Sequence, residues 1–105
     1  MNADPVFKAL SDPSRRALFE RICRDGALTV HALTDGSGIS QPAVSKHLAA
    51  LKRAGLVVGR PVGRETFYAA DLQALQPLVN WIGVYGAFWN DRIDALTQLL
   101  HRMDQ

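Results

Sequence analysis

The residues best suited to chemistry lie at positions 40–54, in the order Ser-Gln-Pro-Ala-Val-Ser-Lys-His-Leu-Ala-Ala-Leu-Lys-Arg-Ala. Val44, Leu48 and Leu51 have the spacing of a helix face that packs on a core. At about 100° per residue, the side chains that point away from this face are Pro42, Lys46, Ala49 and Arg53, with Gln41, Ser45 and Lys52 on one flank. Such a thin polar and basic face can enter a major groove and hydrogen-bond to bases and phosphates. The other interpretation is an ordinary solvated helix face.

Positive charge is concentrated around this helix. The chain has 12 Lys and Arg residues against 10 Asp and Glu residues, and the two signs cancel in residues 1–35. Residues 36–70 carry Glu65 as their single acidic residue and a net charge of +4, whereas residues 71–105 have a net charge of −2. This distribution is the electrostatic pattern of a protein that binds a phosphate backbone, and it favours double-stranded DNA as a partner.

Capping residues predict the helices that position this segment. Ser40 is a natural N-cap, and Gly55 supplies the left-handed residue that ends the helix of about residues 40–54. Asp12 and Thr29 cap two earlier helices, and a further short helix opens at Asp4. Two short helices joined by a glycine-containing turn, the second with polar outward residues, make a helix-turn-helix.

Residues 56–69 predict a β-hairpin. β-Branched and aromatic residues flank Pro61-Val62-Gly63, and Gly63 stands where a tight turn requires a positive φ. Arg60 and Arg64 bracket the tip. A hairpin with arginines at its tip, directly after such a helix, is typical of the wing of a winged helix-turn-helix, and a solvated turn is the alternative.

Residues 71–102 predict a long helix, in which Pro77 either lies early in a new helix or kinks a continuous one. Its apolar residues are more numerous than one helix can bury against a domain of this size. Trp81, Tyr85 and Trp89 step by four along one side. A twofold partner explains such a stripe best, and an aromatic-lined pocket for an unidentified small-molecule effector is the alternative.

Length and composition bound the remaining possibilities. A chain of 105 residues predicts one domain, residues 1–105, mostly α with a small β-hairpin (α+β). It has no apolar run of about 18 residues, so we expect no membrane span. We expect no secretory signal either. Cys23 is the single cysteine, which suits a reducing cytoplasm, and it follows the inward-facing Ile22, so we predict a packed or partly buried thiol.

The sequence offers little for catalysis. It has no Ser/His/Asp, Cys/His or paired-carboxylate set at useful spacing, and no glycine-rich phosphate loop follows a strand. We therefore predict that the protein is not an enzyme. A winged helix that serves as a protein-interaction module, without specific DNA binding, is the alternative function.

Several motifs resemble those of the ArsR-type winged-helix repressors. Residues 9–18, Ala-Leu-Ser-Asp-Pro-Ser-Arg-Arg-Ala-Leu, resemble the opening motif of that family. Residues 40–48, with Leu51 and residues 54–57, are similar to its recognition-helix motif. Gly63-Arg64 and Tyr68 match the wing, so the resemblance spans about residues 6–70. The segment from Trp81 to Leu96 resembles the last helix of a metal-independent branch of the family.

The resemblance implies a cytoplasmic bacterial homodimer that represses transcription at a palindromic operator. It implies that Gln41, Ser45 and Lys46 reach base edges or nearby phosphates, that Ser40 and His47 contact the backbone, and that Arg64 approaches the minor groove. The predicted DNA-binding set is Ser40, Gln41, Pro42, Ser45, Lys46, His47, Lys52, Arg53, Arg60 and Arg64. The implied pairing through the first and last helices gives a predicted dimer interface of Phe7, Leu10, Trp81, Tyr85, Phe88, Trp89, Ile93, Leu96 and Leu100.

The chain departs from the metal sensors of that family. Those proteins carry a Cys-x-Cys pair on the third helix, or Asp-x-His with further ligands on the last helix. Here the third helix offers His31, and the last helix offers Asp91, Asp94 and His101. Two weak ligands on one helix face do not make a tetrahedral site, so we predict no metal and no cofactor.

Overall fold

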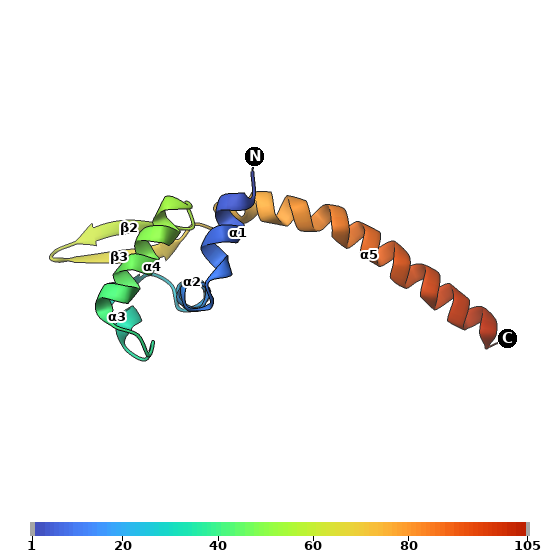
Figure 1. Cartoon of the computed structure of the whole chain (residues 1–105), viewed down its shortest axis with the longest axis horizontal. Helices are drawn as coiled ribbons and strands as arrows, with labels where there is room; N and C mark the ends of the chain where they lie inside the picture. The colour runs from blue at the N-terminus through green and yellow to red at the C-terminus, as the bar shows by residue number, and fades with distance from the viewer. Residues whose placement is uncertain (1, 105) are drawn as a thin grey trace.

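The computed structural model describes residues 2–104. The elements follow in the order α1 (Asp4–Ser11), α2 (Pro13–Asp25), β1 (Leu28–Thr29), α3 (Val30–Thr34), α4 (Gln41–Arg53), β2 (Val57–Val62), β3 (Glu65–Ala70), the 3₁₀ helix η1 (Leu72–Leu75) and α5 (Gln76–Met103). Figure 1 shows α2–α4 gathered beside the sheet, α1 next to the start of α5, and α5 extending away as a long arm. The Cα radius of gyration is 19.1 Å, against about 13 Å for a compact chain of about 100 residues. We call residues 4–75 the body.

The predicted caps form as expected. The Asp12 carboxylate accepts a hydrogen bond from the Arg15 backbone N–H at 3.0 Å, at the start of α2. The Thr29 hydroxyl accepts one from the Ala32 N–H at 3.1 Å, at the start of α3. These contacts satisfy N–H groups that have no partner within the helix itself, which is why the residue types announce where the helices begin.

The hydrophobic core belongs to the body. It is formed by Val6, Ala9, Leu18, Phe19, Ile22, Leu33, Val44, Leu48, Leu51, Leu56 and Val57. Within the described chain, no residue after position 57 is buried. The helices and β2 therefore bury their apolar stripes against one another, and Leu75 and Leu78 only partly cover the edge of that cluster.

The sheet has three antiparallel strands in the order β1-β3-β2. The two wing strands pair from Val57 with Ala70 to Val62 with Glu65, which confirms the predicted hairpin. The prediction of a two-stranded element missed β1, which pairs Leu28 with Tyr68 on the other edge of β3. A strand of two residues is too short to show an alternating pattern, so its pairing depends on an edge supplied about 40 residues later.

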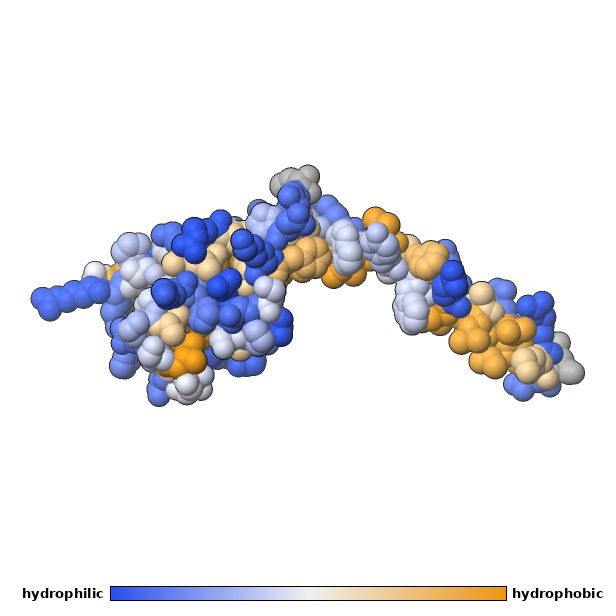
Figure 2. Space-filling view, in the orientation of Figure 1, coloured by the Kyte–Doolittle hydropathy of each residue, from blue (hydrophilic) through white to orange (hydrophobic). Residues whose placement is uncertain are grey.

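The C-terminal segment begins with η1 and continues as α5. The Asp71 side chain accepts a hydrogen bond from the Gln73 N–H at 3.1 Å and so opens η1. Pro77 lies in the first turn of α5, which is the first of the two predicted alternatives. The helix then runs for 28 residues without a buried side chain. Orange hydrophobic residues follow it in the space-filling view (Figure 2).

Cys23 is exposed, so the prediction of a packed or partly buried thiol is wrong. Ile22 faces the core with 1% of its surface exposed. The next residue on a helix is rotated by about 100°, which carries Cys23 past the edge of the buried stripe. Although Cys23 is exposed, neighbouring residues still remove some water from its thiol, and this desolvation, reinforced by the charge of Glu20, raises the pKa of the thiol above its ordinary value. This raised pKa keeps the thiolate population low.

Candidate nucleic-acid interface

Helix α4 is anchored by one face and open on the other. The Ser40 hydroxyl accepts a hydrogen bond from the Ala43 N–H at 3.3 Å, which caps the helix as predicted. Val44, Leu48 and Leu51 are 0–1% exposed and hold the helix in the core. Gly55 ends the helix with a φ of +79°, in the left-handed region that glycine adopts readily. The position of the open face is therefore fixed by packing and by both caps.

The structure gathers eight of the ten residues predicted to bind DNA on α4 and its cap. All of the eight except His47 are exposed. Within residues 2–104, no carboxylate lies within ion-pair distance of Lys46, Lys52 or Arg53. The basic groups of this helix are therefore available to an external anion.

The two remaining predicted residues lie on the wing. Arg60 is on β2 opposite Phe67, and Arg64 is in the turn that joins β2 to β3. Gly63 has a φ of +63°, as the tight turn requires. Both arginines are exposed, and the hairpin tip extends beyond α4 (Figure 1). The wing is therefore a second basic surface beside the helix.

His47 differs from its neighbours because it turns toward α2. It is half-buried, and its Nδ1 accepts a hydrogen bond from Arg15 Nε at 3.4 Å. Arg15 is absent from the predicted set, since the contact joins residues 32 positions apart. The balanced charge of residues 1–35 also concealed it, and only the position of Arg15 soon after the Asp12 cap could have drawn attention to it.

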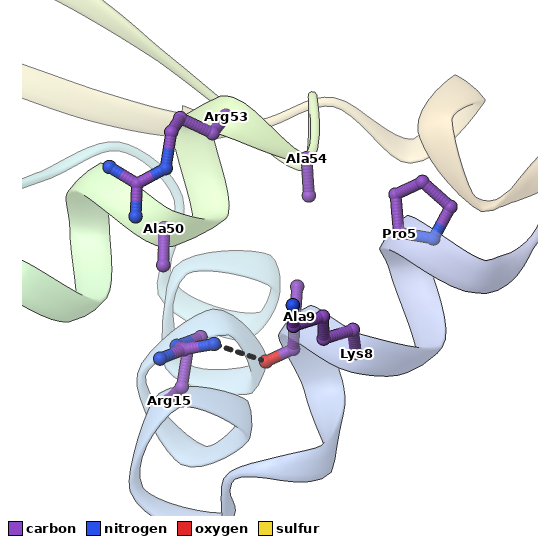
Figure 3. Close-up of a pocket in the computed structure, with 7 residues that line it drawn as sticks. All are labelled: Pro5, Lys8, Ala9, Arg15, Ala50, Arg53 and Ala54. Atoms are coloured by element: carbon purple, nitrogen blue, oxygen red, sulfur yellow. Dashed lines mark hydrogen bonds between the residues drawn. The ribbon is translucent and has the colours of Figure 1, made fainter.

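Arg15 borders a pocket of about 340 Å³ between α1, α2 and α4. The pocket is lined by Pro5, Lys8, Ala9, Arg15, Ala50, Arg53 and Ala54 (Figure 3). Lys8, which lines the same pocket as Ala50 and Arg53 of α4, is also absent from the set predicted from the sequence. The pocket thus joins one predicted residue, Arg53, to two basic residues from the first two helices.

Asp12 is an acidic residue that lies in sequence between two residues of the pocket lining, Ala9 and Arg15. The backbone N–H of Arg15 lowers the pKa of Asp12 from its ordinary value of 3.8, and the positive charge of Arg15 acts in the same direction. Because its oxygen is already engaged in capping α2, Asp12 contributes a local negative charge without lining the pocket.

A second surface joins α1 to the start of α5. The rings of Phe7 and Trp81 meet edge to face with centroids 5.2 Å apart, and Trp81 and Tyr85 are 4.9 Å apart. Farther along α5, Arg92 lies over the Phe88 ring at 4.8 Å. Of the predicted interface residues, Leu10 alone is half-buried. Phe7 and the predicted residues of α5 are 39–63% exposed, so a broad apolar face is open to a partner.

Metal ligands are sparse in the part of the chain that the structure describes. No three His, Cys, Asp or Glu residues among residues 2–104 are grouped closely enough to hold a metal ion. Over the same residues, every helix is too short or too polar to cross a membrane.

Comparisons with known proteins agree with this architecture. A family model described as a helix-turn-helix domain matches residues 10–60. An HTH-type transcriptional regulator of Mycobacterium tuberculosis, Rv2034, is 37% identical over 97 residues, which cover 92% of this chain and 87% of the relative. The transcriptional repressor SdpR of Bacillus subtilis is 34% identical over 77 residues, which cover 73% of this chain and 84% of that protein.

Solved structures resemble the chain over most of its length. An ArsR-like transcriptional regulator from Rhodococcus sp. RHA1 superposes with a TM-score of 0.71 at 33% identity, covering 91% of this chain and 90% of that one. The homodimeric winged helix-turn-helix DNA-binding domain of Mb0332 from Mycobacterium bovis gives a TM-score of 0.64 at 26% identity, covering 80% and 77%.

Proposed function

The chain belongs to the ArsR-type family of winged helix-turn-helix transcriptional regulators, and from this premise we propose that it is a homodimeric repressor that binds a palindromic operator. A member of this family is a regulator and not an enzyme. In the proposed mechanism the protein acts in the cytoplasm by occupying DNA, with no covalent chemistry.

The observation that carries this proposal is the open face of α4. The helix is fixed in the core by Val44, Leu48 and Leu51, whereas its exposed side carries polar and basic groups with no ion-pair partner among residues 2–104. A helix is about 10–12 Å across with its side chains, and the major groove is about 12 Å wide. The match between these two widths supports the proposal that α4 enters a major groove.

In this proposal, residues at the start of α4 contact the bases. Gln41 is exposed in the first turn, and a side-chain amide can pair bidentately with the edge of adenine. Ser45 and Lys46 follow one turn later and reach neighbouring bases or phosphates. Lys52 and the wing residues Arg60 and Arg64 bind phosphates, so they set the salt dependence of the affinity.

The proposed dimer forms through α1 and α5. The cluster of Phe7, Trp81 and Tyr85 continues into the exposed apolar face of α5, and a face of this extent is typical of an interaction surface. Twofold pairing would set the two recognition helices about 34–36 Å apart, one turn of duplex, so the operator would be an inverted repeat.

Selection of bound sequences from a random pool of duplexes tests the proposal. We expect a palindrome whose half-site centres are about 10–10.5 base pairs apart or a multiple of that spacing. A reporter gene placed behind the selected sequence should then be transcribed less when the protein is present. Absence of any salt-sensitive binding to duplexes would favour a protein-interaction module instead. An effector that binds between the α5 helices would appear as a small molecule that releases the selected duplex.

A further inference from the structure

The pocket between α1, α2 and α4 has the lining of an anion site. Three of its seven lining residues, Lys8, Arg15 and Arg53, are basic, and none is acidic. We propose that this pocket binds one phosphate group of the DNA backbone, an inference that rests on the proposed DNA-binding function. The site extends the DNA-binding surface from the helix-turn-helix onto the first helix of the chain.

Arg15 is held in place for this role. Its Nη1 donates a hydrogen bond to the Ala9 carbonyl at 3.4 Å, and its Nε donates to His47 Nδ1 at 3.4 Å. These contacts tie the guanidinium to α1 and α4 at once and leave its remaining N–H groups for another acceptor. Figure 3 shows the guanidinium of Arg53 above that of Arg15, with Ala50 between them.

The other lining residues define the size of the ligand. Ala9, Ala50 and Ala54 carry single methyl groups where α1 and α4 approach each other, which leaves the space of about 340 Å³. The lining contains no aromatic ring that could stack on a base or on a flat metabolite. Cationic edges around small apolar side chains therefore suit a compact oxyanion, and a backbone phosphate is the oxyanion that DNA binding supplies.

The pocket lies where a backbone strand would pass. A helix in a major groove has a phosphate strand beside each flank, because the groove is little wider than the helix. One flank of α4 carries Ser45 and Lys52, whereas Ala50 and Ala54 face the pocket on the other. Arg53, at the open face, borders both the groove surface and the pocket. The pocket and the Lys52 flank would then engage opposite strands.

Two charge-removing substitutions test the site, Lys8→Gln and Arg53→Gln, because both side chains are exposed and have no ion pair to lose. Binding is measured by fluorescence anisotropy on the selected duplex and on a random duplex, over a series of salt concentrations. We expect each substitution to weaken binding several-fold on both duplexes and to reduce the salt slope by about one unit. Thermal unfolding verifies that both variants fold.

Two controls separate a local site from general charge. Arg24→Gln removes the same charge from α2, together with the exposed ion pair of Arg24 with Asp25, at a position nine residues from Arg15 and so about 180° around that helix. It should leave affinity and slope near those of the wild type. Lys8→Arg keeps the positive charge in the pocket and should bind the duplexes about as tightly as the wild type does. Equal losses in Arg24→Gln and Lys8→Gln would overturn the proposal, since they would show that only net charge matters.

Duplexes with one neutral methylphosphonate locate the phosphate. We expect one position per half-site at which the methylphosphonate weakens the wild type but has no further effect on the Lys8→Gln/Arg53→Gln variant. Unchanged affinity in both single variants would overturn the inference while leaving the proposed function intact, provided that the wild type binds the selected duplex. Calorimetry with inorganic phosphate tests whether the pocket binds a free anion instead of a DNA phosphate. Phosphate binding that the double variant loses, without any loss of duplex affinity, would assign the pocket to a free anion and overturn the proposal.

Discussion

The body and helix α5 differ in how far their apolar side chains are buried. In the body, Leu33, Val44 and Leu51 have no exposed surface. In α5, Trp81 is 50% exposed and Trp89 is 63% exposed, although these are the largest apolar side chains of the chain. The body therefore buries its own apolar side chains, whereas the apolar face of α5 lies open to solvent.

This difference indicates that the body determines the folding stability of each chain and that α5 determines the stability of the proposed dimer. Removing a side chain from the body should leave a cavity in packed surroundings, and the cost appears in the folding of each chain. Removing an apolar side chain from α5 should lower the folding stability of a single chain little, but it should lower the stability of a dimer strongly. Substitutions in the two regions can therefore be told apart by their dependence on protein concentration.

The largest effect is expected for Leu51→Ala, which should destabilise the protein by about 2–5 kcal/mol because the side chain is fully buried. Urea unfolding followed by circular dichroism measures this change. Leu96→Ala on α5 is the matched control, and at concentrations where the chain is monomeric it should change stability by no more than about 0.5 kcal/mol. Similar losses in both variants under those conditions would remove the distinction between the two regions.

Tyr85→Glu should come next, by disrupting the dimer. A charge placed in the apolar face opposes its burial, and we expect a loss of about 2 kcal/mol or more in dimer stability, as for other central interface residues. Sedimentation velocity over a concentration series measures the shift. Asn90→Glu adds the same charge to an exposed position on the other side of α5 and should leave the dimer intact. An unaffected dimer in Tyr85→Glu would place the interface elsewhere.

The next smaller effect is expected within the body, on the open face of α4. Gln41→Ala should weaken binding to the selected duplex by about 1–3 kcal/mol and to random DNA very little, since base contacts carry sequence preference. Competition titrations with the two duplexes measure the ratio. Gln73→Ala, at an exposed position in η1, is the control. A loss that is equal on both duplexes would make Gln41 a backbone contact.

Arg64→Ala tests the wing, with a smaller expected effect. The side chain is exposed in the turn between β2 and β3, so its removal should weaken binding to all duplexes alike and lower the salt slope by about one unit. Anisotropy at several salt concentrations provides both quantities. If affinity and slope both stay unchanged, the wing does not bind DNA.

The smallest effect concerns acid stability of the body. The folded pKa of Asp12 is lowered from its ordinary value of 3.8, chiefly by the hydrogen bond from the Arg15 N–H, so the folded state binds fewer protons at this site. Its contribution to stability is present above that value and is lost as the pH falls through the lower folded pKa. Asp12→Asn keeps a capping oxygen but does not titrate, so its stability should fall less steeply in acid. Urea unfolding at a series of pH values checks this, and identical slopes would contradict it.

Local chemistry explains which features could be predicted from the sequence. The caps at Asp12, Thr29 and Ser40 and the turn glycine Gly63 each satisfy a need of the adjacent backbone, so residue type alone indicated them. The pairing of β1 with β3 and the contact between Arg15 and His47 join distant segments. No local pattern reports such contacts, and for this reason the candidate site was recognised on α4 and the wing but missed on α1 and α2.

The edge-to-face contact of Phe7 with Trp81 has a consequence for control of the protein. On α1, Phe7 contacts α5, while the next two residues, Lys8 and Ala9, line the pocket beside α4. Because Phe7 and Lys8 belong to the same helix of eight residues, a tilt of α1 that followed a change at the proposed dimer interface would also shift Lys8 relative to Arg53. In the proposed dimer, one short helix would thereby couple the pairing of the two protomers to the proposed contact with DNA.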